Sequence, residues 1–152
     1  MTLRARIASE LKQATKSRDT LRLSTLRLIN ATIKDREIAR RGEDETQEIQ
    51  DSDIIAIIGR MVKQRQESAR AFEEGGRMEL AEKERAEIAI LEDFLPRQMS
   101  EAEIHAAIEA EIESSGANSI RDMGRVMAAL KERYTGQVDF GKVGPMVRSR
   151  LG

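Results

Sequence analysis

Apolar side chains recur every three or four positions along almost the whole chain, and this spacing restricts the fold more than any other feature. Leu3, Ile7 and Leu11 begin the first of these stripes. In a helix of 3.6 residues per turn, such spacing places the apolar side chains on one face. Aromatic residues make up only 3% of the chain and valine is scarce, which argues against a β-sandwich or barrel. The sequence therefore predicts an all-α protein.

Residues 1–95 are predicted to form an N-terminal helical bundle. A short first helix ends before the polar segment 16–19, and a second helix runs from Thr20 to about Arg41. Leu21 and Leu28 lie nearly opposite the main apolar stripe of this second helix. Because apolar residues on two sides call for neighbours on two sides, we expect it to be the most buried helix of the protein.

A long antiparallel helical hairpin is predicted to complete the bundle. After a polar, acidic link over residues 42–51, Asp51 or Ser52 is a plausible N-cap for a helix that continues to Glu74. Gly75 and Gly76 interrupt the pattern, and helical spacing resumes over residues 77–95. Each arm of about 20 residues would be roughly 30 Å long.

The hairpin contains charged residues at positions where apolar ones are expected. Arg65 lies in the apolar face of one arm, and Glu84 lies in the apolar face of the other. Folding about the two glycines brings Arg65 near residue 86, between Glu84 and Glu87. We predict a structural ion pair from Arg65 to Glu84 or Glu87 that fixes the register of the arms. The alternative is that these residues face a ligand pocket.

Residues 96–152 are predicted to form a small three-helix C-terminal domain. Pro96 disfavours helical geometry at the preceding residue, and Ser100 with Glu103 forms a capping box that begins a new helix. A second helix follows the similar segment 119–122 and ends near Gly136. The last helix starts after Asp139, and its glycines and Pro145 weaken it.

The overall charge does not identify a partner. The net charge of the 152 residues is −1, but residues 1–41 hold eleven Lys and Arg against four acidic residues. The next twelve residues hold six acidic residues and no basic one. Such an acidic run can screen a neighbouring basic segment within a Debye length of roughly 8 Å.

The residues needed for common catalytic and metal sites are scarce. The chain has no cysteine, its single histidine is His105, and it contains no zinc, calcium or phosphate-loop motif. We therefore expect no catalytic residues, no bound metal and no cofactor, and an autonomous enzyme is unexpected. No run is long and apolar enough to cross a membrane, and the first residues lack a signal-peptide core. These features lead us to expect a cytoplasmic protein that does not contact membranes.

Binding through basic groups remains open to this chain. Exposed aromatic platforms for single-stranded bases are missing, so any nucleic-acid contact is expected with the backbone of a folded RNA. The alternative is an ordinary solvated surface, since acidic residues alternate with the basic ones. The candidate nucleic-acid-binding residues are Arg121, Arg125, Lys131, Arg133 and Lys142.

The chain resembles the YqeY-like family, and the resemblance covers essentially its whole length. The residues that carry it are Lys63, Gln64, Arg65, Ser68, Phe72, Gly76, Arg77, Leu80, Ala81, Glu84, Glu87, Ile88, Leu95, Pro96, Glu101, Asp122, Met123, Gly124, Arg125, Val126, Met127, Gly136 and Asp139. The Gly144–Pro145 pair departs from the family's pattern, which usually continues as helix there.

The resemblance implies a function as well as a fold. The family shares its domain with the tail of the B subunit of the tRNA-dependent glutamyl/aspartyl amidotransferase, a tail similar to a tRNA-recognition module. Its label mentions carbon–nitrogen ligase activity with glutamine as amido donor, but this chain has no room for the catalytic parts of that complex. We therefore expect a noncatalytic, tRNA-associated accessory protein. The alternatives are a helical module that binds a protein partner or a second copy, and a participant in amide transfer on aminoacyl-tRNA.

Overall fold

The computed structural model describes residues 1–42 and 48–152; residues 43–47 of the predicted acidic link lie outside it. Within the described residues the structure is helical and contains no strand, which confirms the all-α prediction. The chain divides into two compact units, Met1–Leu95 and Pro96–Gly152, and each is described by itself. The α-helices are α1 (Leu3–Ser17), α2 (Thr20–Gly42), α3 (Asp51–Glu74), α4 (Met78–Glu92), α5 (Glu101–Ser115), α6 (Met123–Tyr134) and α7 (Phe140–Leu151), with a 3₁₀ turn η1 (Ile120–Asp122) before α6.

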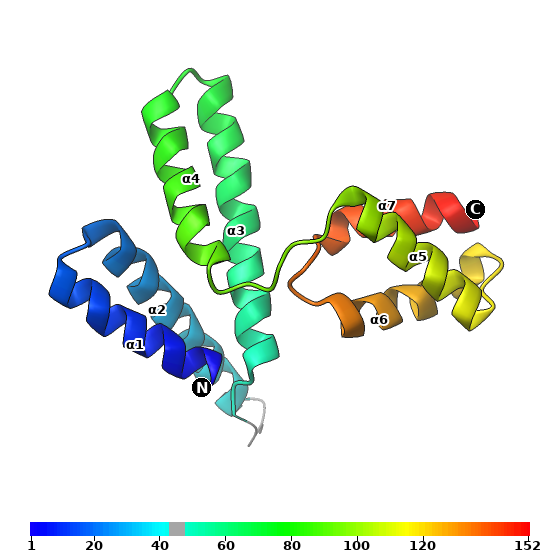
Figure 1. Cartoon of the computed structure of the whole chain (residues 1–152), viewed down its shortest axis with the longest axis horizontal. Coiled ribbons are helices and arrows are strands. Elements are labelled where there is room, and N and C mark those ends of the chain that lie inside the picture. The colour runs from blue at the N-terminus through cyan, green and yellow to red at the C-terminus, as the bar shows by residue number, and fades with distance from the viewer. Residues whose placement is uncertain (43–47) are drawn as a thin grey trace. The chain divides into compact units, whose positions relative to one another are not determined.

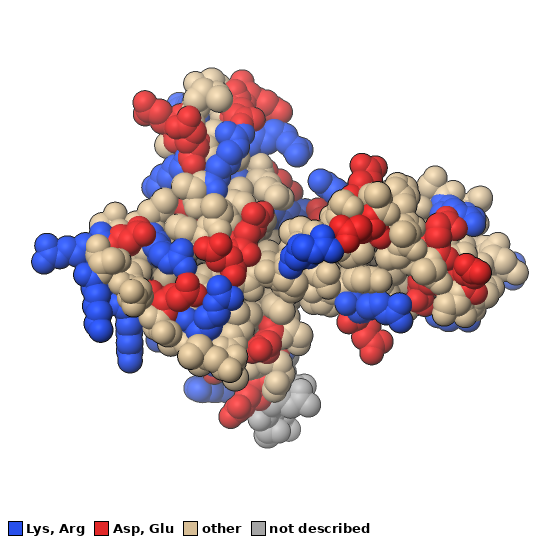
Figure 2. All heavy atoms as spheres, viewed as in Figure 1, with Lys and Arg blue, Asp and Glu red and all other residues tan. Residues whose placement is uncertain are grey.

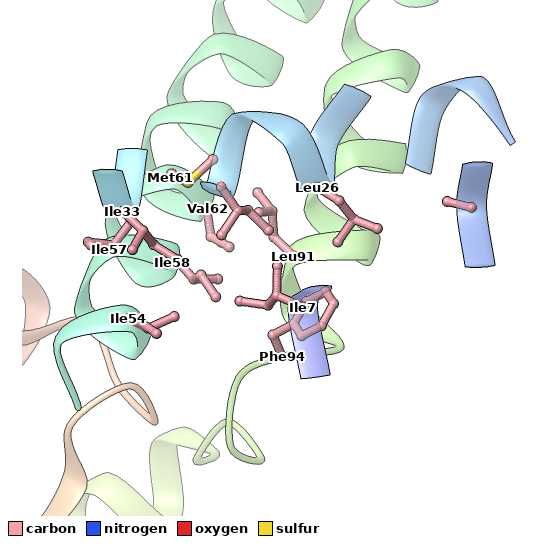
Figure 3. Close-up of a cluster of buried hydrophobic side chains, with 12 residues drawn as sticks. Ile7, Leu26, Ile33, Ile54, Ile57, Ile58, Met61, Val62, Leu91 and Phe94 are labelled. Carbon is pink, nitrogen blue, oxygen red and sulfur yellow. The ribbon is translucent and has the colours of Figure 1, made fainter. Parts of the chain in front are cut away.

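The first unit is built on the α3–α4 hairpin, whose arms run side by side in opposite directions (Figure 1). The turn falls at the predicted glycines, and Gly76 has a φ of 74°, a conformation that costs glycine little. Helices α1 and α2 pack against the hairpin and against each other. Figure 3 shows the resulting core, in which Ile7 of α1, Leu26 of α2 and Leu91 of α4 point toward one another.

The prediction that α2 is the most buried helix is wrong. Its core-facing stripe is buried as expected, but Leu28 on the opposite side is 45% exposed. Both helices contact three others, but α3 contributes more buried residues because it packs most extensively, along its hairpin partner α4. These residues are Ile54, Ile57, Ile58, Met61, Val62 and Ala69.

The start of α3 also differs from the sequence prediction. Its N-cap is Gln50, because both expected caps lie inside the first turn of the helix. The Asp51 carboxylate accepts a hydrogen bond from the Leu3 backbone N–H at 3.1 Å. The Asp53 carboxylate accepts from the Gln50 N–H at 2.8 Å and from Arg40 at 2.6 Å. The acidic first turn of α3 is therefore attached to α1 and α2.

The second unit is a three-helix arrangement with its own core (Figure 1). Ser100 caps α5 by accepting from the Glu103 N–H at 3.1 Å, as predicted from the capping box. Residues before α5 are attached to the turn after α6, since the Met99 N–H donates to the Gln137 carbonyl at 3.0 Å. Pro145 lies inside α7 and does not end it, so this helix runs unbroken through the Gly144–Pro145 pair. The core of this unit consists of Ile108, Ile112, Ala117, Val126, Leu130, Val143, Val147 and Leu151.

Candidate nucleic-acid interface

The candidate interface begins at the turn before α6. The Asp122 carboxylate accepts hydrogen bonds from the backbone N–H groups of Asn118 at 3.1 Å and Ser119 at 3.4 Å. Arg125 donates to the same carboxylate at 3.1 Å. The Asn118 N–H, together with the Ser119 N–H and Arg125, lowers the pKa of Asp122 and outweighs desolvation, which raises it. This acidic residue therefore holds the turn and orients Arg125.

The five predicted basic residues are all exposed, but they do not share one face. Lys131 follows Met123 and Met127 at four-residue intervals, so it lies on the flank of α6 that those methionines occupy. Arg133 is two residues further along the chain, so it lies about 160° around the helix from Lys131. A single flat partner on one flank of α6 can therefore reach Lys131 or Arg133, but not both.

Helix α7 packs on the methionine flank of α6. A Cβ built on Gly144 would lie 4.0 Å from the terminal methyl carbons of Met123 and Met127, which identifies the two facing surfaces. Arg148 follows Gly144 by one turn, is exposed, and therefore borders the same α6–α7 junction as Lys131. Sequence reasoning missed Arg148 because its position depends on which side of α7 packs against α6. Lys142 is exposed near the start of α7.

Charge is divided within the second unit. Helix α5 contains five glutamates and neither lysine nor arginine, whereas residues 116–152 contain seven Lys and Arg against three acidic residues. In the view of Figure 2, acidic side chains lie along α5. Two of those three acids serve as helix caps, because Asp139 accepts from the Gly141 N–H at 2.9 Å and Asp122 holds the turn described above. The α6–α7 side of this unit is therefore basic.

Gly124 leaves open space on this basic side. It is an exposed residue of α6, and a Cβ added there would meet no atom within 4 Å. Because glycine destabilises a helix by roughly 0.5–1 kcal/mol relative to alanine, neither packing nor helix stability explains its presence. Close approach of a partner to the backbone of α6 would explain it.

The ion pair predicted for Arg65 lies in the first unit. Arg65 Nε lies 3.0 Å from Glu87 Oε2, and Arg65 Nη1 donates to the Met61 carbonyl at 3.2 Å. The two side chains are only 13% and 17% exposed. Of the two alternatives, Glu87 is the residue that receives the Arg65 hydrogen bond, and Glu84 lies one turn before it on α4.

In the part of the chain that the structure describes, few other side chains are candidates for catalysis or metal binding. His105 Nε2 lies 3.8 Å from Glu101 Oε1, and both side chains are largely exposed. Outside residues 43–47, the structure contains no group of three or more side chains that could hold a metal ion. Among the same residues, no helix combines the length and the apolar character needed to cross a bilayer.

Comparison with known proteins identifies fungal relatives, all named "Altered inheritance of mitochondria protein 41, mitochondrial". The protein from Lachancea thermotolerans is 28% identical over a segment that covers 84% of this chain and 63% of the relative. The Kluyveromyces lactis protein is 32% identical over 59% of this chain and 46% of the relative. The Pyrenophora tritici-repentis protein is 29% identical over 84% of this chain and 71% of the relative. The chain thus spans about half to two thirds of the length of the first two relatives.

These names contradict the expectation of a cytoplasmic protein. That expectation rested on the lack of cysteine, of a membrane-spanning run and of a signal-peptide core. None of these features distinguishes the cytoplasm from another reducing compartment. The relatives are named as mitochondrial proteins, so the cytoplasmic assignment is wrong.

A family model agrees with the resemblance drawn from the motifs on α3, α4 and α6. The model described as "Yqey-like protein" matches residues 4–151, which is nearly the whole chain. The chain therefore belongs to the YqeY-like protein family.

Proposed function

We propose that this protein is a noncatalytic accessory protein that binds the phosphate backbone of tRNA through the α6–α7 side of its second unit. The observation that carries the proposal is the cluster of exposed basic side chains beside the open backbone at Gly124. Phosphate contacts by Lys and Arg position a nucleic acid without reading its bases. The resemblance to the amidotransferase tail makes tRNA the first RNA to test.

The geometry favours a subset of the basic residues. Lys131 and Arg148 border the α6–α7 junction near Gly124, whereas Arg125, two residues after Met123, and Arg133 lie away from the methionine flank of α6. Each phosphate contact that is lost should reduce the slope of log affinity against log salt concentration by about 0.7–0.9. Lys131→Gln and Arg148→Gln should each reduce this slope, and Arg125→Gln and Arg133→Gln should change it less.

The test is a salt titration of tRNA binding to the full chain, followed by fluorescence anisotropy. Arg70→Gln is the matched control, because Arg70 is exposed and lies on α3 in the first unit. An affinity for tRNA no greater than for a random acidic polymer would reject specific recognition. Equal slopes for the parent protein, Lys131→Gln and Arg148→Gln would reject this surface as the binding site.

Gly124 provides an independent test of the same surface. Gly124→Ala should stabilise the second unit by about 0.5–1 kcal/mol, because its Cβ meets no neighbour. Gly124→Gln should also fold, but its longer side chain should obstruct the approach of RNA and weaken binding. Circular dichroism checks the fold, and unchanged tRNA affinity of a folded Gly124→Gln variant would argue against close contact at this helix.

A further inference from the structure

The outward face of α2 is the least explained surface of the first unit. Its opposite face supplies buried residues to the core, and Figure 3 shows Leu26 and Ile33 pointing into it. On the outward side, Leu28 is 45% exposed and Ile38 is 63% exposed. Ala31, between them in the sequence, is also exposed. This face thus exposes two large apolar side chains that the core does not use.

The exposed residues follow the seven-residue repeat of a coiled coil. Leu28 and Asp35 occupy a positions of the repeat, and Ala31 and Ile38 occupy d positions. The three g positions that immediately precede the a positions are all basic. They are Arg27, Lys34 and Arg41, and all three are exposed. Since g positions set the choice of partner in coiled coils, this pattern specifies the charge of the opposing helix.

The charge pattern disfavours pairing of α2 with another α2. In an antiparallel pair, g positions face g positions, so Arg27 would oppose Arg41 and Lys34 would oppose Lys34 of the second copy. In a parallel pair, the two Asp35 carboxylates would meet at the centre of the interface. Like charges held together in this way are destabilising.

The apolar residues also distinguish between classes of partner. A nucleic acid would contact the three basic residues but would leave Leu28 and Ile38 in water. A helix with an apolar stripe covers these side chains and pairs with the basic residues at the same time. Arg27 and Arg41 are 14 residues apart, or about 21 Å along the axis, so the opposing helix needs about 15 residues or more.

We propose that the outward face of α2 binds an acidic amphipathic helix of a partner protein, packed along α2 as a two-stranded coiled coil. The partner helix carries Glu or Asp at its e and g positions and a Lys or Arg opposite Asp35, which fixes the register. This interaction is separate from RNA binding by α6 and α7 and does not depend on it.

The proposal can be tested with designed peptides of 21 residues and the full chain. The first peptide has Leu at a and d, Glu at e and g, and one Lys opposite Asp35. The second has the same composition in scrambled order, and the third carries Lys at e and g. Isothermal titration calorimetry should show the first peptide binding at least tenfold more tightly than the other two.

Charge reversal on α2 provides the decisive comparison. The triple variant Arg27→Glu/Lys34→Glu/Arg41→Glu should reverse the preference, so that the Lys peptide binds more tightly than the Glu peptide. The matched control reverses three exposed basic residues on α1 and α3 and should keep the original preference. It is Lys12→Glu/Lys16→Glu/Arg70→Glu. Ile38→Lys should weaken binding of the Glu peptide at least tenfold while the circular dichroism spectrum stays unchanged.

Other outcomes would overturn the proposal. Equal binding of the scrambled peptide would show only nonspecific attraction, and equal loss in the control variant would place binding elsewhere. Self-association of the chain alone that Ile38→Lys abolishes would identify a second copy as the occupant. Binding to vesicles containing 30% anionic lipid, lost in the α2 triple variant while the Glu peptide fails to bind, would identify a membrane surface instead.

Discussion

Glu103 holds the start of α5 through two kinds of hydrogen bond. Its carboxylate accepts from the Arg97 guanidinium at 2.6 and 3.0 Å and from the Ser100 backbone N–H at 3.0 Å. The Arg97 hydrogen bonds, followed by those of Ser100, lower the pKa of Glu103 from 4.5 to about 2. The ionised form is thus favoured by the folded state.

This shift predicts a loss of stability in acid. Because the pKa of Glu103 is lower in the folded than in the unfolded chain, its contribution is complete above about pH 4.5 and is lost as the pH falls toward 2. Glu103→Gln should remove this part of the pH dependence. Chemical denaturation between pH 7 and pH 2 measures it, and parallel curves for the two proteins would contradict the assigned role.

At this scale, sequence reasoning works where partners are close in the chain. The Ser100–Glu103 capping box was predictable, because both hydrogen bonds join residues three positions apart. The N-cap of α3 was not predictable in the same way. Asp51 is a good capping residue by type, but its carboxylate accepts a hydrogen bond from Leu3, which is 48 positions away.

At the scale of elements, the hairpin register depends on the Arg65–Glu87 pair. A carboxylate that is only 17% exposed is costly to leave without its partner. Arg65→Ala should therefore destabilise the hairpin by about 2 kcal/mol, whereas Arg65→Met/Glu87→Leu should be nearly neutral or stabilising. Native-state hydrogen exchange of α3 and α4 amides measures the change in each variant.

A second ion pair on the same hairpin provides the control. Arg85 pairs with Glu73, and its side chain is 50% exposed. Exposed ion pairs contribute little, so Arg85→Ala should cost less than about 1 kcal/mol. Equal costs for Arg65→Ala and Arg85→Ala would show that burial of the Arg65 pair has no energetic importance.

The first and last residues of most helices could be predicted, within a few positions, from the spacing of apolar residues and from the residues that end helices. Gly75 and Gly76 separate α3 from α4 as predicted, and α1 and α2 end within a few residues of the expected positions. The distribution of the basic residues around α6 follows from helical geometry only after the packing of α7 is known. Gly144 against Met123 and Met127 supplies that information, and it adds Arg148 to the candidate interface.

At the scale of the whole molecule, each of the two buried clusters draws its residues from one unit. Ile58 belongs to the cluster of the first unit and Val147 to that of the second, and both are fully buried. Ile58→Ala should destabilise the first unit by about 2–5 kcal/mol, and Val147→Ala should destabilise the second by a smaller amount. Hydrogen exchange should show each effect confined to residues 1–95 or 96–152. Equal acceleration across both ranges would show that the chain unfolds as one unit.

The amino-acid sequence by itself determined that the chain is helical and where most of its helices begin and end. Periodicity, caps and glycine breaks act between residues a few positions apart, so they can be interpreted without a fold. Only the tertiary structure decided that Glu87 receives the Arg65 hydrogen bond, that Leu28 stays exposed on α2 and that Arg148 borders the α6–α7 junction. Each of these depends on which faces of separate helices meet, and that is settled by the packing of the core as a whole.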